Sequence, residues 1–468
     1  MKFCIHGHFY QPPREEPISN KIPNERGASP YKNWNERICA ECYTPNARAG
    51  NFEKISFNIG PTLFNWMFEN VSETAKLIVE QENVNFNKYG AGNGMAQAYN
   101  HSILPLQSWL DKITQVRWGV EEFKYRFGHS PDGMWLAETG VDLETLCALS
   151  DCGLCFTILA PWQVKPLDGQ NQNGPFLVDL PDGRSPFVVF TYDREVSTKI
   201  SFMPKATENG DDFLRYMFGK HNKKNGITVL ASDGELYGHH QKFRDLFLTY
   251  ILGDGASKFG IQWTYPALYL KENAVNKRAM LDEPSSWSCM HGVGRWSYDC
   301  GCTPGSEWKA PMREAINAIA EWVDEQYLYA FKGLNLQYYE NSEYAWEMRH
   351  RYIDVMLGKK SVDKLGEEIF GEFWKELDAN KIAILLEAQL ERQKMFTSCG
   401  WFFDDFNRIE PANNIAYAAK AVWLCMKANN EKFDTSILDL LRKTNSPKTG
   451  LNAETIFLNT LERAEQRV

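Results

Sequence analysis

A series of short apolar runs, each followed at once by polar or charged residues, is the strongest constraint on the fold. The run "KFCI" precedes His6, "MWLA" precedes Glu138 and "ITVLAS" precedes Asp233, and "ISFNIG", "CFTILA" and "FVVFTY" end in the same way. Continuous apolar runs with β-branched residues are typical of strands that are buried on both faces, as in a parallel sheet. The sequence therefore predicts a parallel sheet with polar side chains at the ends of its strands.

Helical patterns lie between these runs. In "VDLETLCALSDCG", Leu143, Leu146 and Leu149 recur at a spacing of three residues. Thr139 or Asp142 is a suitable cap at the start, and Gly153 is a suitable end. Strands that alternate with helices indicate an α/β barrel or an open α/β sheet. Polar residues that collect after strand ends favour a site at the C-terminal face of a barrel.

The character of the chain changes near residue 310. From there to residue 468 the patterns are helical, and Pro411 suits the first turn of one of the expected helices. We expect a catalytic barrel at 1–309 and a helical bundle at 310–468 that packs on it. The polar, proline-containing stretch 14–50 is expected to be a long loop, and loops of that length are more often functional or mobile than plain connectors.

The composition excludes some classes of protein. The net charge is −9, from 51 Lys and Arg against 60 Asp and Glu, so nucleic acid is not an expected partner. No segment reaches the roughly 20 apolar residues that would span a bilayer, so no membrane association is expected. The N-terminus lacks the apolar stretch of a signal peptide, and 11 cysteines without one indicate free thiols in a reducing compartment. We therefore expect a cytoplasmic protein.

Glu138 and Asp233 are the strongest candidates for chemistry. Each ends a buried run and has a glycine within two residues. Cleavage of a glycosidic bond commonly uses two carboxyl groups, one ionised and one protonated. Rigid strand ends hold such groups in place, and apolar neighbours push their proton affinities apart. Taken singly, either residue is also consistent with a helix cap or a loop carboxylate.

Five ordered segments resemble glycoside hydrolase family 57. They are "HGHFYQPP" (6–13), "YNHSILPL" (99–106), "GMWLAETG" (133–140), "SDGELYGHH" (232–240) and "SWSCMHGVGRWSYDCGC" (286–302). The later "TSCGWFFDDFNRIEP" (397–411) is similar to an uncharacterised helical extension found in one subgroup. Two features depart from the family pattern: Phe9-Tyr10 interrupts the first motif, and Asn93 stands near the place where the second region usually has a glutamate. These departures indicate a substrate that differs from the family's better-known α-glucans.

The resemblance implies a (β/α)7 barrel followed by a helical region. It also implies a retaining enzyme that acts on α-linked glucans or oligosaccharides, of the amylase or 4-α-glucanotransferase type, without a cofactor. Glu138 is then the nucleophile and Asp233 the general acid and base. Two other hypotheses remain open at this point, a metal-dependent carbohydrate deacetylase on a related barrel and a non-catalytic carbohydrate-binding relative.

Histidines and aromatic residues near the motifs are expected to contact substrate. His6 and His8 are expected to hydrogen-bond sugar hydroxyls, although with Asp233 and His101 they also form a plausible zinc set. The aromatic run Trp401 to Phe403 is expected in a loop, as packing or as a platform for sugar stacking. The expected substrate contacts are His6, His8, His101, Trp135, Trp162, Glu235, His239, Trp287, His291, Asp299 and Trp401.

Two close cysteine pairs raise the question of a metal site. They are Cys39 with Cys42 and Cys300 with Cys302. The spacing of the second pair is short for a zinc knuckle, and no clear third pair exists. We therefore expect free thiols and no bound metal.

Overall fold

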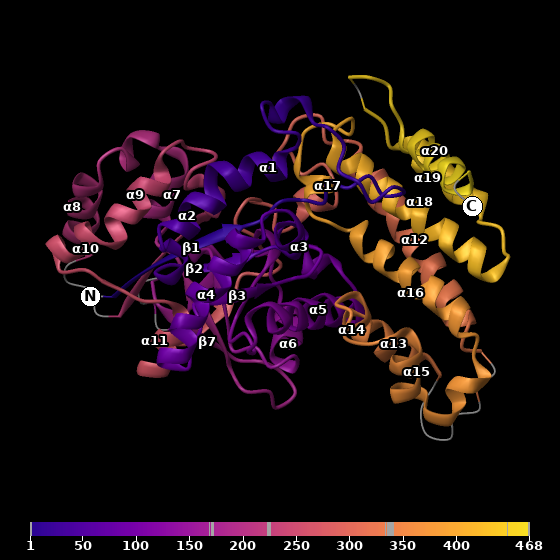
Figure 1. Ribbon diagram of the computed structural model, residues 1–468, viewed down its shortest axis with the longest axis horizontal. Helices are drawn as coiled ribbons and strands as arrows, with labels where there is room; N and C mark the ends of the chain where they lie inside the picture. Colours follow the sequence, from indigo (N-terminus) through magenta and orange to yellow (C-terminus); the bar gives the residue numbers. More distant parts are fainter. Residues whose placement is uncertain are drawn as a thin grey trace. The chain divides into compact units, whose positions relative to one another are not determined.

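Figure 1 shows a computed structural model of the chain, which describes residues 2–167, 169, 173–221, 226–332, 334, 341–446 and 448–466. The chain forms two compact units, and each contains several separate stretches of sequence. The first unit comprises Met1–Gln11, Pro23–Ala98 and Phe123–Ser288. The second comprises Pro12–Ile22, Tyr99–Glu122 and Cys289–Val468.

The first unit contains a ring of parallel strands, and all of the strand pairs around it are parallel. In ring order the strands are β1 (Lys2–Phe9), β2 (Ser56–Ile59), β3 (Gly94–Gln97), β4 (Met134–Trp135), β5 (Phe156–Leu159), β8 (Phe187–Thr191) and β9 (Ile227–Asp233). Within the described residues this ring has seven strands, which confirms the expected barrel. Cys4, Met95, Ile158, Phe190 and Val229 form one buried cluster, so side chains pack together across the strands.

Two joints of the ring are weaker than the others. β4 meets β5 through the single bridge Gly133–Phe156, and β8 meets β9 through the bridge Tyr192–Val229. A side chain supports the first joint, where the Thr157 hydroxyl donates to the Met134 carbonyl at 2.8 Å. The ring therefore consists of one continuous hydrogen-bonded segment, β9-β1-β2-β3-β4, and a second sheet that contains β5 and β8.

Helices and short strands complete the first unit. The helices are α3 (Pro61–Asn70), α4 (Ser72–Tyr89), α6 (Leu143–Asp151), α7 (Arg194–Phe202), α8 (Gly210–His221), α9 (Arg244–Leu252), α10 (Asp254–Phe259) and α11 (Pro266–Glu272). The remaining strands are β6 (Val164–Pro166), β7 (Pro175–Val178), β10 (Gln262–Trp263) and β11 (Ala279–Leu281). Asp142 caps α6, because its carboxylate accepts a hydrogen bond from the Thr145 N–H at 2.7 Å, and Gly153 follows the helix at a positive φ of 82°.

The expectation that 14–50 is a loop throughout was wrong. This segment contains α1 (Trp34–Ile38), a π-helical turn (Cys39–Tyr43) and α2 (Thr44–Arg48). The Asn46 amide donates to the Cys42 carbonyl at 2.8 Å and to the Tyr237 carbonyl at 2.7 Å. Such contacts to a distant part of the chain stabilise helices that the local sequence does not predict.

The described part of the second unit is mostly helical, as expected. Its longer helices are α12 (Lys309–Tyr329), α13 (Asn341–Arg351), α15 (Val362–Phe370), α16 (Ala379–Lys394), α18 (Ile409–Asn429) and α20 (Ala453–Glu465). Its shorter helices are α14 (Ile353–Met356), α17 (Cys399–Phe402) and α19 (Leu438–Lys443), and α5 (Trp109–Phe127) contributes its residues up to Glu122. Pro411 lies in the first turn of α18, as the sequence predicts.

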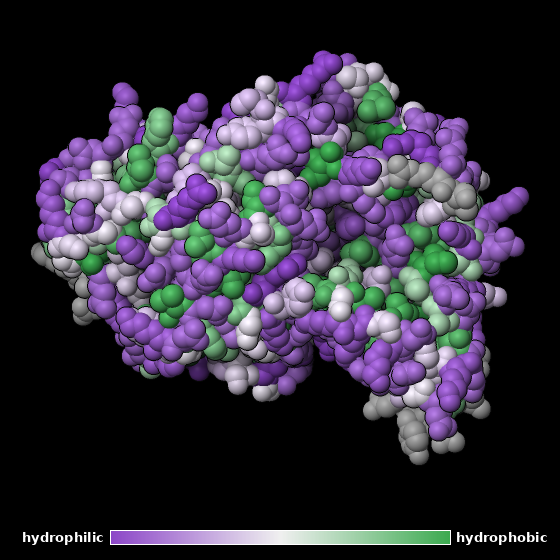
Figure 2. All heavy atoms as spheres, viewed as in Figure 1, coloured by the Kyte–Doolittle hydropathy of each residue, from purple (hydrophilic) through white to green (hydrophobic). Residues whose placement is uncertain are grey.

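The face of the molecule shown in Figure 2 is mostly hydrophilic, and its hydrophobic residues occur in small, separate groups. Among the described residues, no helix combines the length and the apolar composition that crossing a bilayer requires.

Candidate active site

Glu138 sits on a strained turn just after β4. It lies in a single 3-10 turn (Ala137–Thr139) and has φ 54° and ψ 23°, in the left-handed region. Thr139 is also left-handed, with φ 51°. Each such residue costs on the order of 1–3 kcal/mol and persists where surrounding contacts hold it. Gln163 provides these contacts, since it accepts from the Thr139 hydroxyl and donates to the Thr139 carbonyl, both at 2.8 Å.

Two donors bind the Glu138 carboxylate. The Trp287 indole N–H donates to Oε2 at 2.9 Å, and the Ser288 hydroxyl donates to the same oxygen at 2.8 Å. The Trp287 backbone N–H also donates to the Glu138 carbonyl at 3.1 Å. Hydrogen bonds from donors suit an ionised carboxylate, and they fix the orientation of the group. Glu138 is half-buried, so its carboxyl group is held but not sealed off.

Asp233 ends β9 on the same segment of the ring as β4. It is in register with His8 of the neighbouring strand β1, so the two side chains lie side by side. Asp233 is exposed at the end of β9, yet many protein atoms surround its carboxyl group. This desolvation, together with the negative charge of Glu138, raises the pKa of Asp233 to about 7. This pKa keeps Asp233 partly protonated at neutral pH.

A hydrogen-bond network supports the strand ends. Asn58 of β2 donates to Nδ1 of His8 at 3.0 Å and to Oε1 of Gln97 at 2.7 Å, and its oxygen accepts from Nε2 of His6 at 3.2 Å. The Asn58 oxygen also lies 3.2 Å from Nδ1 of His8, so Asn58 contacts both imidazoles. Both imidazoles stack on Trp135, at centroid distances of 4.6 Å for His6 and 5.2 Å for His8.

Both histidines are neutral at neutral pH. Burial lowers the pKa of His6 to about 3, with a further contribution from His8, and burial lowers the pKa of His8 to about 4. His6 and Trp135 have no accessible surface, whereas His8 has 6%. His6 and Trp135 therefore lie behind the site and support it, and His8 is the member of this group that reaches the surface near Asp233.

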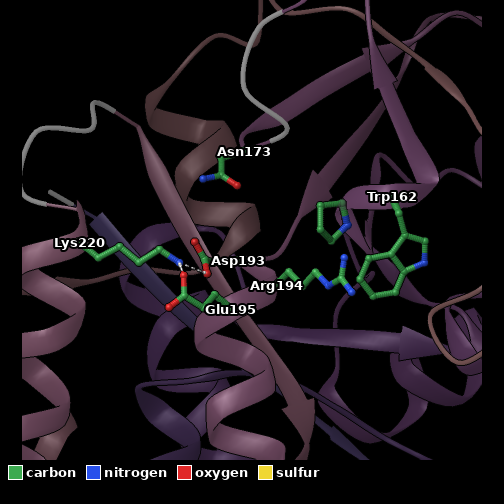
Figure 3. Close-up of a pocket in the computed structure, with 7 residues that line it drawn as sticks. Trp162, Asn173, Asp193, Arg194, Glu195 and Lys220 are labelled. Atoms are coloured by element: carbon green, nitrogen blue, oxygen red, sulfur yellow. Dashed lines mark hydrogen bonds and ion pairs between the residues drawn. The ribbon is translucent and has the colours of Figure 1, made fainter.

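Trp162 lines a pocket of about 230 Å³ in the first unit, together with Arg194, Asp193, Glu195 and Lys220. In Figure 3 the Arg194 side chain points toward the Trp162 ring, and the Lys220 side chain points toward Asp193 and Glu195. The Arg194 guanidinium lies 5.2 Å from the indole centroid, and Lys220 Nζ lies 3.0 Å from Asp193 and 2.9 Å from Glu195.

Aromatic contacts connect this pocket to Glu138. Trp162 packs edge-on against Tyr192 at 6.1 Å, and Tyr192 packs edge-on against Trp287 at 6.5 Å. The Trp162 indole also donates to the Ser286 carbonyl at 3.1 Å. Since Trp287 binds the Glu138 carboxylate, a chain of ring contacts through the buried Tyr192 links the pocket to the strained turn.

Two further expected residues of the first unit bind protein groups. The buried Glu235 accepts from the Gln11 amide at 2.7 Å and from the Tyr43 hydroxyl at 3.0 Å. His239 Nδ1 lies 2.6 Å from the Glu41 carboxylate, and its ring contacts Trp34. These contacts attach the helical 34–48 segment to the turn after β9.

Four expected substrate contacts belong to the second unit. His101 is buried and pairs with Ser398 at 2.7 Å, and Asp299 accepts from the Gly301 N–H at 3.1 Å. His291 Nδ1 lies 3.4 Å from the Cys302 sulfur. Trp401 lies in helix α17 and not in the expected loop, and it is 1% exposed, stacked against Phe396. That burial argues against Trp401 as a platform for sugar stacking.

His6, His8 and Asp233, which belong to the alternative zinc set that the sequence leaves open, do not converge as metal ligands in the part of the chain that the structure describes. There, the His, Cys, Asp and Glu ligand atoms that converge within 4.8 Å belong to Cys289, His291, Cys300 and Cys302. Cys39 and Cys42 are buried, and the Cys42 thiol donates to the Gly234 carbonyl at 3.5 Å.

The family model of glycosyl hydrolase family 57 matches residues 16–274, which is more than half of the chain. The chain belongs to glycosyl hydrolase family 57. A second family model, a domain of unknown function (DUF3536), matches residues 305–466 of this family 57 protein. A comparison with curated proteins gives no match.

Solved structures share the fold of this family 57 chain. An exo-type maltose-forming amylase from Pyrococcus sp. ST04 is 17% identical with a TM-score of 0.74, over 98% of this chain and 88% of that one. The 4-alpha-glucanotransferase from Thermococcus litoralis is 14% identical with a TM-score of 0.57, over 93% and 60%. The alpha-amylase AmyC from Thermotoga maritima is 13% identical with a TM-score of 0.56, over 97% and 99%.

Three residues around the carboxyl groups of this family 57 chain were not predicted from sequence. Asn58 fixes both histidines, Gln163 holds the strained turn and Ser288 binds Glu138. Asn58 had a detectable signal, because it is a polar residue inside the apolar run "ISFNIG". Gln163 ends a 3-10 turn and Ser288 lies in a loop, where a polar residue is ordinary, so their contacts become visible only once the chain is folded.

Proposed function

We propose that this protein cleaves or transfers α-linked glucans with retention of configuration, with Glu138 as the nucleophile and Asp233 as the general acid and base. The observation that carries the proposal is the difference between the two carboxyl environments. Glu138 accepts two hydrogen bonds that suit a carboxylate, whereas crowding and the charge of Glu138 raise the pKa of Asp233 to about 7. One ionised and one protonated carboxyl group are what double displacement requires.

The reaction has two steps. In the first, the Glu138 carboxylate attacks the anomeric carbon while the Asp233 proton moves to the leaving glycosidic oxygen, and a glycosyl ester of Glu138 forms. In the second, the Asp233 carboxylate takes a proton from water or from a sugar hydroxyl, whose oxygen attacks the anomeric carbon and releases Glu138. Water as acceptor gives hydrolysis, and a sugar hydroxyl as acceptor gives transfer.

Neighbouring residues supply groups suited to a sugar. His8, whose ring is neutral at neutral pH, lies beside Asp233, and Trp287 and Trp162 add aromatic rings. Aromatic rings with polar neighbours suit sugars, which present both C–H faces and hydroxyls. The structurally similar proteins are named as an amylase and a 4-alpha-glucanotransferase, which supports an α-glucan as the substrate class.

Azide rescue tests the two roles separately. With an α-glucosyl substrate that carries a good leaving group, the Asp233→Ala enzyme still forms the glycosyl ester, and azide then displaces Glu138 to give an α-glucosyl azide. In Glu138→Ala, azide attacks the substrate directly from the vacated side and gives a β-glucosyl azide. Without azide we expect Asp233→Ala to lose about 10²–10⁴-fold in kcat on natural glucans. Proton NMR identifies the anomer of each product.

Asp142→Asn is the matched control, because asparagine also caps a helix and Asp142 lies only four residues from Glu138. It should keep wild-type turnover and stability. Natural-substrate turnover that survives in both Glu138→Ala and Asp233→Ala would refute the proposal, as would a wild-type product of inverted configuration.

A further inference from the structure

Four potential metal ligands, three cysteines and one histidine, converge in the second unit within the short segment 289–302. Cys289 and His291 lie in the loop before a 3-10 turn (Gly294–Trp296), and Cys300 and Cys302 follow that turn. One ligand atom from each residue lies within 4.8 Å of all the others. The spacing is C-x-H-x8-C-x-C, which joins the Cys300 and Cys302 pair to a second pair formed by a cysteine and a histidine.

We propose that Cys289, His291, Cys300 and Cys302 bind one zinc ion in a closed, structural site. The sulfur of Cys289 lies 3.8 Å from that of Cys300 and 3.8 Å from that of Cys302. With Zn–S bonds of about 2.3 Å, a tetrahedral site separates its sulfur ligands by about 3.8 Å. Nδ1 of His291 lies 3.4 Å from the Cys302 sulfur, close to the roughly 3.6 Å between sulfur and nitrogen ligands of such a site.

The same distances disfavour the other uses of clustered cysteines. A disulfide has an S–S bond of about 2.05 Å, so no pair in this cluster is bonded. In a [4Fe–4S] cluster each thiolate binds a different iron atom, which keeps the four ligands too far apart to meet at one point. Convergence of all four ligand atoms fits a single ion, and three sulfurs with one imidazole form a common structural zinc set.

The backbone and the surrounding charge also suit this ion. Gly301, at φ 76°, separates the two last cysteines, and Asp299 accepts its N–H, so the turn brings both thiols to the same side. This hydrogen bond gives Asp299 a structural role that requires no contact with substrate. Three thiolates exceed the charge of a zinc ion by one. The buried Lys309 interacts electrostatically with Cys300 and Cys289, although burial and the charge of Arg295 lower its pKa to about 8. An ammonium with little access to water is stabilised beside such an anionic site.

The proposed zinc ion has no role in the chemistry proposed for Glu138 and Asp233. Four protein ligands leave no position for water or substrate, so the ion stabilises the segment and takes no part in bond cleavage. Cys289 directly follows Ser288, whose hydroxyl binds Glu138. Metal content and ligand geometry are measured without any sugar, so this inference and the proposed function fail independently.

The first test is the metal content of the full chain, purified under reducing conditions from zinc-supplemented cells. We expect one zinc per chain by mass spectrometry. X-ray absorption should show three sulfurs at about 2.3 Å and one nitrogen at about 2.0–2.1 Å. Zinc well below one per chain that added zinc does not restore, iron with inorganic sulfide, or a disulfide within segment 289–302 would each overturn the proposal.

Variants then assign the ligands. Cys300→Ser and Cys302→Ser should bind zinc at least tenfold more weakly in competition with a chelating dye. Cys155→Ser, which removes an exposed free thiol of the first unit, should match the wild type. If the serine variants fail to fold, His291→Cys remains decisive. It should keep one zinc and change the absorption signal from three sulfurs and one nitrogen to four sulfurs, and an unchanged signal would overturn the assignment.

Discussion

At the scale of single residues, the strained backbone at Glu138 is linked to the orientation of the Glu138 carboxylate. Two consecutive residues, Glu138 and Thr139, hold left-handed conformations that a β-branched threonine rarely adopts. Gln163 donates to the Thr139 carbonyl, and the Trp287 backbone N–H donates to the Glu138 carbonyl. A relaxed turn would aim the carboxylate elsewhere, so we attribute this strain to the orientation that the proposed nucleophile needs.

The Glu138→Gly variant should therefore be more stable than the Glu138→Ala variant. Both Glu138→Gly and Glu138→Ala remove the carboxylate, but glycine adopts a positive φ without steric cost. We expect the free energy of unfolding of Glu138→Gly, from thermal unfolding, to exceed that of Glu138→Ala by about 1 kcal/mol. This figure includes the entropic cost of glycine. At the exposed helical position Glu321 the order should reverse, with alanine ahead by about 0.5–1 kcal/mol. Equal stabilities at position 138 would mean that the turn relaxes in the variants.

The raised pKa of Asp233 predicts a basic limb in the rate profile. The general acid must be protonated when substrate binds, so kcat/KM should fall about tenfold per pH unit above about pH 7, as Asp233 loses its proton. Asp233→Asn should have low activity without this limb, because the group that titrates is gone. Asp142→Asn should keep the limb. A limb that survives in Asp233→Asn would assign the titration to another group.

The sequence singles out Glu138 and Asp233 as candidates, and their catalytic roles stay a prediction, but it does not single out Asn58, Gln163 or Ser288. Glu138 and Asp233 stand out because each ends an apolar run. Their proton affinities depend on packing density and on each other's charge, and both depend on how strands distant in the sequence pair. The proposed zinc ligands were divided between two expectations, since His291 was assigned to substrate and Cys300 and Cys302 to free thiols.

At the scale of elements, apolar runs predicted the barrel strands well, and polar segments predicted helices poorly. The 34–48 segment forms helices because it contacts the turn after β9, for example through Asn46 and Tyr237. In the second unit, helical periodicity predicted the helical character of the chain after residue 310, including the start of α18 near Pro411, because an apolar stripe is a local signal. The same periodicity gives no indication of the charged groups buried between the helices.

Four helices of the second unit meet at a buried charge network. Asp111 of α5 lies 2.8 Å from Arg392 of α16 and 3.1 Å from Arg349 of α13, and Arg392 also lies 2.7 Å from Asp324 of α12. Although burial opposes it, the charges of the two arginines hold the pKa of Asp111 down at about 2. Asp111 therefore stays ionised at neutral pH and offsets two guanidinium groups that have little access to water.

Removing Asp111 should destabilise the second unit strongly. Asp111→Ala leaves Arg349 and Arg392 buried with less compensating charge, so we expect a loss of about 3–5 kcal/mol. A lower urea midpoint in the helical circular dichroism signal measures it. Asp439→Ala removes an exposed partner of Arg442 and should cost at most about 1 kcal/mol. Equal effects of the two substitutions would show that the buried network adds nothing beyond a surface ion pair.

At the scale of the whole molecule, the chain passes between the two units several times, and the expected site residues divide with it. Glu138, Asp233, His8 and Trp287 belong to the first unit, whereas His101, His291, Asp299 and Trp401 belong to the second. Motif order along the chain does not reveal this division, because neighbouring residues such as Ser288 and Cys289 fall in different units.

The weak joints of the ring have a consequence for substrate size. Glu138 follows β4 and Asp233 ends β9, so the two carboxyl groups sit at opposite ends of the unbroken segment β9-β1-β2-β3-β4. Strand hydrogen bonds within that segment set their spacing. β5 and β8, with Trp162 and Arg194 just beyond them, meet it through single bridges. We therefore expect any adjustment of the rim to substrate to occur at these two joints, while the spacing of the two carboxyl groups stays constant.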